Sequence, residues 1–133
     1  MPMRSQPLIL IADDDPGFQE IIGAKLKRNG YLIAEALDGR EAVEKAGNLH
    51  PDLILMDIDM PGETGTEAVL DLKKNPETKD IQVVFLTGLN EPWPAVNPEQ
   101  NEKLAKELGA LQFLSKTEDL DIITEKIKTL LKQ

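Results

Sequence analysis

The sequence predicts an α/β fold in which helices cover both faces of a parallel sheet. Two observations support this prediction: strand and helix patterns alternate along the chain, and the strand patterns are continuous apolar runs. Such runs are typical of parallel strands buried on both faces. The 133 residues are enough for one domain with a proper core, and we expect a single domain over residues 1–133.

Five strands and five helices account for residues 8 to 132. The expected strands are residues 8–12, 31–36, 52–57, 81–87 and 111–115. The expected helix starts are Asp15-Pro16, Asp38, the capping box Thr64-Gly-Thr-Glu67, Asn97-Pro98 and Thr117. The first four helices are expected to end at Asn29-Gly30, Gly47-Asn48, Asn75-Pro76 and Gly109.

Residues 88–96 form a longer loop than is usual between a strand and a helix. The loop carries the only tryptophan, Trp93, between Pro92 and Pro94. Two interpretations stay open. The loop is either a rigid surface excursion whose indole covers apolar area, or a partner contact or lid beside a site.

The composition excludes several classes of function. A formal net charge of −9 disfavours direct nucleic-acid binding, which needs a basic surface, and it gives no attraction to anionic membranes. Cysteine is absent, so disulfides and thiolate metal sites are not expected. No apolar stretch approaches the roughly 18 residues that span a bilayer, and the first residues lack the apolar core of a secretory signal. We therefore expect a cytoplasmic domain.

Four of the apolar runs end on residues suited to phosphoryl chemistry. These residues are Asp13-Asp14-Asp15, Asp57, Thr87 and Lys116. Because ligands of an open parallel sheet bind beyond the carboxyl ends of its strands, we expect these side chains to converge on one small site.

The adjacent carboxylates Asp13 and Asp14 predict a cation site. Two carboxylates in a small volume repel each other, and a bound cation relieves the repulsion. Carboxylate oxygens select a hard ion, and Mg²⁺ is the usual ion of phosphate chemistry. In the simpler interpretation the acidic run only caps a helix, but Asp15 alone would suffice for that. With Asp57 as a third candidate ligand, we favour magnesium.

Asp57 ends the expected central strand and has two possible roles. Its carboxylate could ligate the metal, and it could attack phosphorus to form an acyl phosphate. Such transfer depends mainly on positioning and on neutralising negative charge. The ammonium of Lys116 would supply positive charge, and the hydroxyl of Thr87 would donate to a phosphoryl oxygen.

These segments resemble response regulator receiver domains of two-component signalling, over about residues 8–132. The matching segments are Leu-Ile-Leu-Ile-Ala-Asp-Asp-Asp (8–15), Asp-Ile-Asp-Met-Pro (57–61) with Gly65 after it, Val-Val-Phe-Leu-Thr-Gly (83–88) and Gly-Ala-Leu-Gln-Phe-Leu-Ser-Lys (109–116). The resemblance implies a flavodoxin-like, doubly wound sheet of five parallel strands in the order 2-1-3-4-5, with five helices. It also implies a phosphorylation switch of a phosphorelay and not a turnover enzyme.

The resemblance further implies roles for four aspartates at the expected site. Asp57 is expected to accept the phosphoryl group, with Asp13 and Asp14 as the magnesium-binding pair and Asp59 lending a backbone carbonyl to the metal. A histidine kinase or a phosphotransfer protein would be the donor. Slow hydrolysis by the protein itself would reset the switch.

The remaining implied roles concern the switch. Thr87 and Lys116 would sense and neutralise the phosphoryl group, and the aromatic ring of Phe113 would turn inward when Thr87 moves. This movement would repack the face made by the fourth helix, the fifth strand and the fifth helix, where a downstream protein binds.

Three features depart from the family pattern. Thr117 follows Lys116 where the family usually has proline, which predicts a different loop and a less fixed lysine. The long loop after Thr87 leaves the position of the fourth helix open. Thr64 stands where many members have an acidic cap, a change that we expect to be harmless.

The alternative function is an aspartyl phosphatase of the haloacid dehalogenase type, because Asp57-Ile-Asp59 also resembles its nucleophile motif. That family places its acidic metal pair late in the chain and needs a cap or a longer core. A flavin carrier is disfavoured, since no Ser/Thr-rich phosphate loop follows the first strand and three aspartates there would repel a phosphate. His50, next to Pro51, is expected to be a surface residue and not a phosphotransfer histidine.

Overall fold

A computed structural model of the chain describes residues 5–88 and 98–132. The strands are β1 (Leu8–Ala12), β2 (Leu32–Ala36), β3 (Leu53–Asp57), β4 (Gln82–Thr87) and β5 (Phe113–Ser115). The helices are α1 (Pro16–Arg28), α2 (Gly39–Leu49), α3 (Gly65–Lys74), α4 (Pro98–Glu107) and α5 (Leu120–Leu131). The predicted alternation of strands and helices is confirmed.

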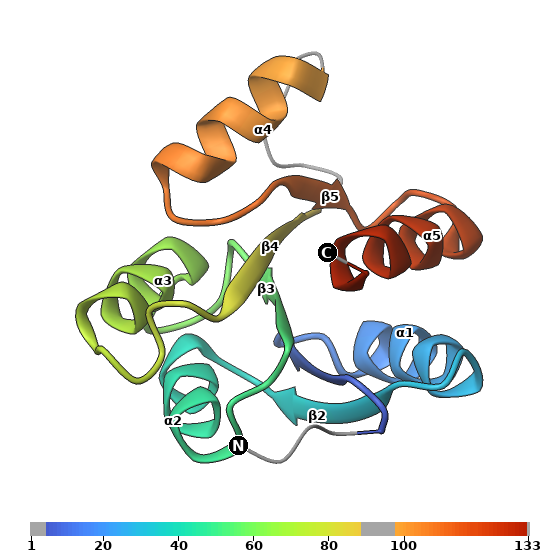
Figure 1. The fold of residues 1–133 in the computed structure, drawn as a ribbon, viewed down its shortest axis with the longest axis horizontal. Helices are drawn as coiled ribbons and strands as arrows, with labels where there is room; N and C mark the ends of the chain where they lie inside the picture. The colour runs from blue at the N-terminus through green and yellow to red at the C-terminus, as the bar shows by residue number, and fades with distance from the viewer. Residues whose placement is uncertain (1–4, 89–97, 133) are drawn as a thin grey trace.

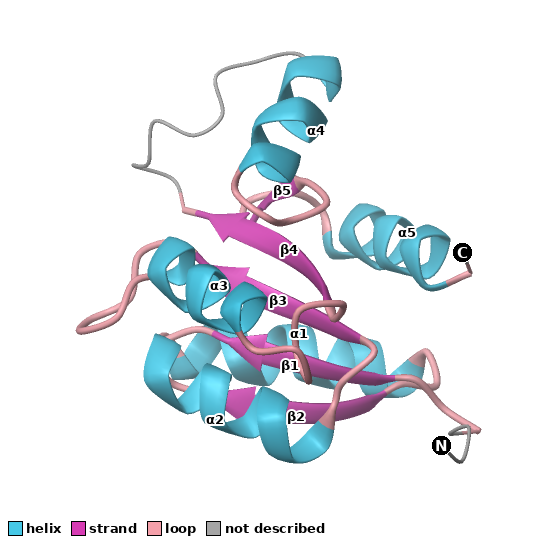
Figure 2. Ribbon diagram, turned by 60° about the vertical axis from the view of Figure 1, so that its left-hand side comes forward, coloured by secondary structure: helices cyan, strands magenta, loops and turns pink. Residues whose placement is uncertain are grey.

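The strands form one parallel sheet in the order β2-β1-β3-β4-β5. Helices α1 and α5 lie on one side of this sheet, and α2 and α3 lie on the other (Figure 1). Figure 2 shows the strand arrows pointing the same way between the helix layers. The predicted fold class and strand order are therefore confirmed.

Alternate residues of the central strands contribute to two separate apolar cores. Leu10 and Phe85 belong to the core that packs against α2, α3 and α4, whereas Ile9 and Leu86 belong to the core against α1 and α5. Because successive side chains of a strand point to opposite faces, one apolar run supplies both cores. Every residue of β1 and β3 is buried, as their continuous apolar character predicted.

Most of the predicted helix caps are confirmed. Asp15 accepts a hydrogen bond from the backbone N–H of Gly17 at 2.9 Å, and Asp38 accepts one from Glu41 at 2.8 Å. Thr64 and Glu67 form the predicted capping box at the start of α3. The proposed cap Asn97 and most of the long loop, residues 89–96, lie outside the described residues.

Two predicted helix boundaries are wrong. Helix α2 continues through Gly47 and Asn48 to Leu49, and the chain turns at His50, which adopts the left-handed conformation with φ 46°. Helix α5 begins after Asp119 and not after Thr117. The hydroxyl of Thr117 lies 2.7 Å from the hydroxyl of Ser115, within hydrogen-bond distance, so it is engaged with β5 and not with the helix.

Four strands begin one or two residues later than predicted. The largest difference is at β5, which begins at Phe113 and not at residue 111. In the described part of the chain, no helix has the length and apolar character that crossing a membrane requires.

Candidate functional site

The carboxyl ends of β1, β3 and β5 bring the predicted polar residues together. Oxygen atoms of Asp13, Asp14 and Asp57, one from each carboxylate, all lie within 4.8 Å of one another. The ammonium nitrogen Nζ of Lys116 lies 2.6 Å from Asp13 Oδ2 and 3.1 Å from Asp57 Oδ2. Three carboxylates and one ammonium from three separate strand ends thus form one cluster, as the topology predicted.

Asp57 is held in a buried and well-defined position. Only 2% of the residue is exposed. Its Oδ1 accepts a hydrogen bond from the backbone N–H of Asp59 at 3.3 Å, and its Oδ2 accepts one from Lys116 at 3.1 Å. Burial, followed by the negative charge of Asp13, raises the pKa of Asp57 to about 7, against the opposing effect of Lys116.

Lys116 is fixed at both its backbone and its side chain. Its backbone N–H donates to the carbonyl of Thr87 at 2.9 Å, which ties the end of β5 to the end of β4. Burial alone would lower the pKa of the ammonium, but the contacts with Asp13 and Asp57 outweigh it and raise the pKa. The lysine therefore stays charged at the centre of the cluster.

The donor set of this cluster fits a hard divalent cation. Asp13 is fully buried, and its Oδ2 has only the ion pair with Lys116, without a hydrogen bond of good geometry. When all three carboxylates are ionised, one ammonium leaves the cluster negative. Asp14 is exposed, so the cluster is open to solvent on one side, as Mg²⁺ with its retained waters requires. Asp59 is exposed next to this cluster, and the metal role of its carbonyl stays a prediction.

Thr87 and Phe113, the two predicted switch residues, are both buried where β4 pairs with β5. The hydroxyl of Thr87 donates to the carbonyl of Leu114 at 3.4 Å, a long hydrogen bond, and the residue is 2% exposed. The ring of Phe113 is buried and stacks on Phe85, with centroids 5.4 Å apart. The ring predicted to turn inward already lies inside in this structure.

Three further residues shape the site without having been assigned a chemical role. Gly65 packs so closely on β3 that a Cβ atom there would lie 2.2 Å from the carbonyl oxygen of Asp57. The buried amide of Gln19 donates to the carbonyls of Ile11 at 2.8 Å and Ala36 at 2.9 Å, which anchors α1 to β1 and β2. The ammonium of Lys116 lies over the ring of Phe18, with Nζ 5.1 Å from the ring centroid.

Neither Phe18 nor Gln19 was predicted from the sequence to belong to the site. Their positions in the sequence could have indicated this, since they follow the cap residue Asp15 by three and four residues. One helical turn after a cap, a side chain lies again on the side of the helix that faces the end of the strand.

Comparison with known proteins identifies the family. Residues 9–128 match the model of the response regulator receiver domain. The chain belongs to this family. It is 32% identical over 123 residues to Protein PilH of Pseudomonas aeruginosa, covering 92% of this chain and 96% of that protein. It is 30% identical to the phosphate regulon transcriptional regulatory protein PhoB of Escherichia coli, covering 94% of this chain and 52% of that protein.

The receiver domain also matches longer relatives and solved structures. It is 34% identical to a probable cyclic di-GMP phosphodiesterase of Vibrio cholerae, of which it spans 26%, and it spans 50% of the transcriptional regulator RpaA of Synechocystis. The structure of the V. cholerae chemotaxis response regulator CheY4 matches with a TM-score of 0.80 and 26% identity, covering 95% of this chain and 99% of that one.

Membership gives the general function of the domain. Receiver domains are phosphorylation switches of two-component signalling that take phosphoryl groups from histidine kinases and bind Mg²⁺ at an aspartate cluster. In this receiver domain, Asp13, Asp14 and Asp57 form a group of three neighbouring carboxylates. The match over residues 9–128 favours this interpretation over the haloacid dehalogenase alternative.

Proposed function

We propose that this receiver domain accepts a phosphoryl group on the carboxylate of Asp57, with a histidine kinase or a phosphotransfer protein as the cytoplasmic donor. One observation carries the proposal: Asp57 Oδ2 lies 3.1 Å from the ammonium of Lys116, inside a cluster with two further carboxylates. In the transfer, an Asp57 oxygen attacks phosphorus, the bond from phosphorus to the donor imidazole nitrogen breaks, and that nitrogen keeps the electron pair.

The residues around Asp57 have different roles in the transfer. The carboxylates of Asp13, Asp14 and Asp57, with the backbone carbonyl of Asp59, would hold Mg²⁺, which supplies positive charge to phosphoryl oxygens when bound. Lys116 supplies a second positive charge from the carboxyl end of β5 and opposes the rise in the pKa of Asp57. Asp57 must be ionised to attack, so this ammonium favours the reactive form of the nucleophile.

The switch would act through Thr87. Its hydroxyl makes a long bond to Leu114 of β5, and a phosphoryl oxygen on Asp57 offers a charged and therefore stronger acceptor. Turning the hydroxyl toward Asp57 would loosen β5 and change the packing of Phe113 against Phe85. The face of α4, β5 and α5 would then bind a downstream protein, while the acidic composition disfavours nucleic acid and anionic membranes. Slow hydrolysis of the aspartyl phosphate would reset this switch, so the domain does not act as a turnover enzyme.

Intact-mass spectrometry with acetyl phosphate tests the proposal. We expect one added phosphoryl group that requires Mg²⁺, is absent from Asp57→Asn, and persists in Glu63→Gln. Glu63 is the matched control because its pKa is also raised to about 7 although it lies in another acidic cluster. An adduct that survives in Asp57→Asn would contradict the proposal. So would the absence of an adduct from folded wild-type protein with both acetyl phosphate and a phosphorylated histidine donor.

A further inference from the structure

Among the described residues, the ammonium of Lys116 contacts two carboxylates and one aromatic ring. Asp13 and Asp57 lie at 2.6 and 3.1 Å, and the ring of Phe18 completes the set with its centroid 5.1 Å from Nζ. A cation within about 6 Å of an aromatic centroid is attracted by the negative face of the ring. The lysine side chain is only 18% exposed, so water screens this attraction weakly.

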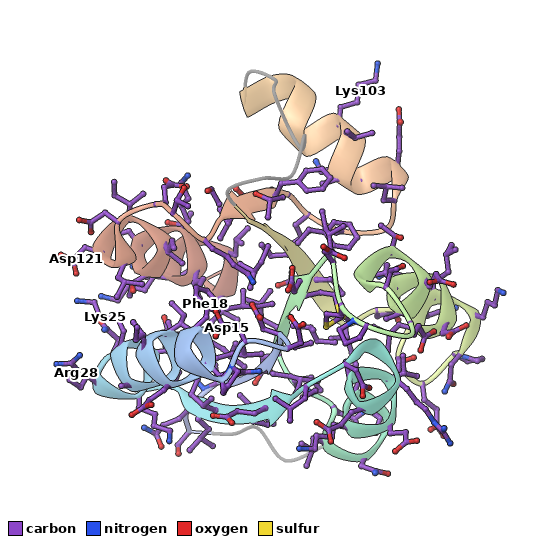
Figure 3. The ribbon with its side chains drawn as sticks, turned by 180° about the vertical axis from the view of Figure 1, so that it is seen from behind. Asp15, Phe18, Lys25, Arg28, Lys103 and Asp121 are labelled. Atoms are coloured by element: carbon purple, nitrogen blue, oxygen red, sulfur yellow. The ribbon has the colours of Figure 1, made fainter. Side chains whose placement is uncertain are left out.

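Phe18 is partly buried and is tied to the sheet by its neighbours. It lies in the first turn of α1, close to the cap residue Asp15, at the end of the helix next to the sheet (Figure 3). The next residue, Gln19, is bonded to backbone carbonyls of β1 and of residue Ala36 in β2. The ring also packs on the apolar core that β1 and β3 share with α1 and α5. Its position is therefore set by the strands that carry Asp13 and Asp57.

The two charged contacts of Lys116 are unequal. The ammonium lies nearer to Asp13 than to Asp57, and both carboxylates change their charge environment when a phosphoryl group arrives on Asp57. The loop beyond Lys116 is held by hydrogen bonds between Ser115 and Thr117, and these bonds do not restrain the four-carbon side chain of Lys116. The face of a neutral ring keeps its attraction whatever the charge on the carboxylates.

We propose that Phe18 is a positioning residue that holds the ammonium of Lys116 against the reacting oxygen of Asp57. This inference rests on the proposed function, because it assigns Phe18 a role in the same phosphoryl transfer. Phe18 itself exchanges no proton and contacts no reacting atom. The ring restricts the positions that the ammonium of Lys116 occupies. The ammonium therefore lies next to Asp57 in a larger fraction of encounters with a phosphoryl donor.

The contact itself is tested by NMR of the lysine side chain, without any phosphoryl donor. We expect the ring current of Phe18 to shift the methylene protons of Lys116 next to Nζ upfield in the wild-type protein, because Nζ lies 5.1 Å from the ring centroid. We expect Phe18→Leu to abolish this shift and Phe18→Tyr to keep it. Unshifted Lys116 signals in the wild-type protein would overturn the inference.

The role is tested by the rate of phosphorylation by acetyl phosphate with saturating Mg²⁺. We expect Phe18→Leu to slow the reaction about threefold to tenfold and Phe18→Tyr to restore it. Leu130→Ala is the structural control, because Leu130 packs on the same apolar core from α5, and we expect it to lower stability but not the rate. In a Lys116→Met background, Phe18→Leu should have no further effect on the rate.

The outcomes separate this inference from the proposed function. A wild-type protein that accepts no phosphoryl group overturns the proposed function. A wild-type protein that reacts while Phe18→Leu reacts equally fast overturns the role of Phe18 alone. The same conclusion follows if Phe18→Leu slows the Lys116→Met protein as much as it slows the wild-type protein.

Discussion

Two acidic clusters of this molecule each contain a carboxyl group whose pKa is raised to about 7, and only one of them has the geometry of a site. The pKa of Asp57 is raised mainly by burial. The pKa of Glu63 is raised mainly by a hydrogen bond with Asp71, followed by burial. Asp57 is 2% exposed at the end of a central strand, whereas Glu63 lies in the loop before α3 and is partly open to solvent.

The neighbours of the two groups differ more than their pKa values do. Asp57 has the ammonium of Lys116 at 3.1 Å and the carboxylate of Asp13 within 4.8 Å. The charges that act on Glu63 come from acidic groups, including Asp71 and Glu67. A raised pKa therefore identifies crowded carboxylates, while convergence from separate strands and a paired cation identify a site.

Removing the ammonium of Lys116, which only the first cluster contains among the described residues, should have the largest of the predicted effects. We expect Lys116→Met to slow phosphorylation of Asp57 about 100-fold, because a positioned charge is lost from a buried site. The control is Lys126→Met, which removes a more exposed ion pair with Glu118 at 2.9 Å and should leave the rate unchanged. Rates of adduct formation by intact-mass spectrometry measure both. Equal rates for the wild-type and Lys116→Met proteins would show that the ammonium of Lys116 does not contribute to phosphorylation.

Gly65 joins the two clusters, since it follows the loop of Glu63 and packs on the backbone of Asp57. We expect Gly65→Ala to lower the free energy of unfolding by about 3 kcal/mol, because its Cβ would lie 2.2 Å from the carbonyl oxygen of Asp57. Gly47→Ala is the matched control in α2, with nothing within 4 Å, and should be stabilising by about 0.5 kcal/mol. Urea denaturation distinguishes the two outcomes, and an equally stable Gly65→Ala would contradict the close packing.

The raised pKa of Asp57 predicts how the metal-free protein responds to pH. The pKa lies near 7 in the folded state and near 3.8 when the chain is unfolded, so the folded state binds more protons between these values. Stability in EDTA should therefore fall as the pH rises from about 4 to about 7. The full difference between the two pKa values corresponds to about 4 kcal/mol, and screening by the solvent that reaches the cluster should reduce the loss to about 2 kcal/mol.

Asp57→Asn is the comparison for this pH dependence. The variant should lose the contribution of Asp57 and be more stable than the wild-type protein at pH 8 in EDTA, and Mg²⁺ should reduce the difference. Thermal denaturation across the pH range measures the effect. A wild-type protein that is more stable than Asp57→Asn at pH 8 without metal would show that Lys116 already compensates the buried charge.

The smallest effect should come from the second cluster. We expect Asp71→Asn to return the pKa of Glu63 toward its ordinary value, because it replaces the carboxylate that accepts a hydrogen bond from protonated Glu63 by a neutral amide, which can donate to ionised Glu63. The change in stability should stay below about 0.5 kcal/mol, since water screens these charges. A ¹³C NMR titration of the Glu63 carboxyl group measures the shift. A midpoint that stays near 7 in Asp71→Asn would assign the shift to burial.

Particular residues show which parts of this molecule the sequence could predict. The apolar runs that end on Asp57 and Lys116 predicted both the strands and their convergence, because strand alternation and parallel topology are properties of the chain pattern. The caps Asp15 and Thr64 were also predictable, since each bonds to a backbone N–H two or three residues later.

The mispredicted positions depend on contacts that no local pattern records. Thr117 has the right chemistry for a cap, but its hydroxyl is engaged by Ser115, and the cap passes to Asp119. Gly47 has the right chemistry to end a helix, but the turn falls on His50. The contact between Phe18 and Lys116 joins side chains that are distant in sequence, so only the packing of α1 on the sheet could show it.

Locating the phosphoryl group tests the central claim most directly. Borohydride reduction converts a phosphorylated aspartate into homoserine, and peptide mass spectrometry then identifies the residue. After reaction with acetyl phosphate and Mg²⁺, we expect homoserine at position 57 and unmodified Asp71 and Glu63. Reduction at a carboxylate of the second cluster, with Asp57 unmodified, would contradict the account, because among the described residues the charges that act on Glu63 come from acidic groups.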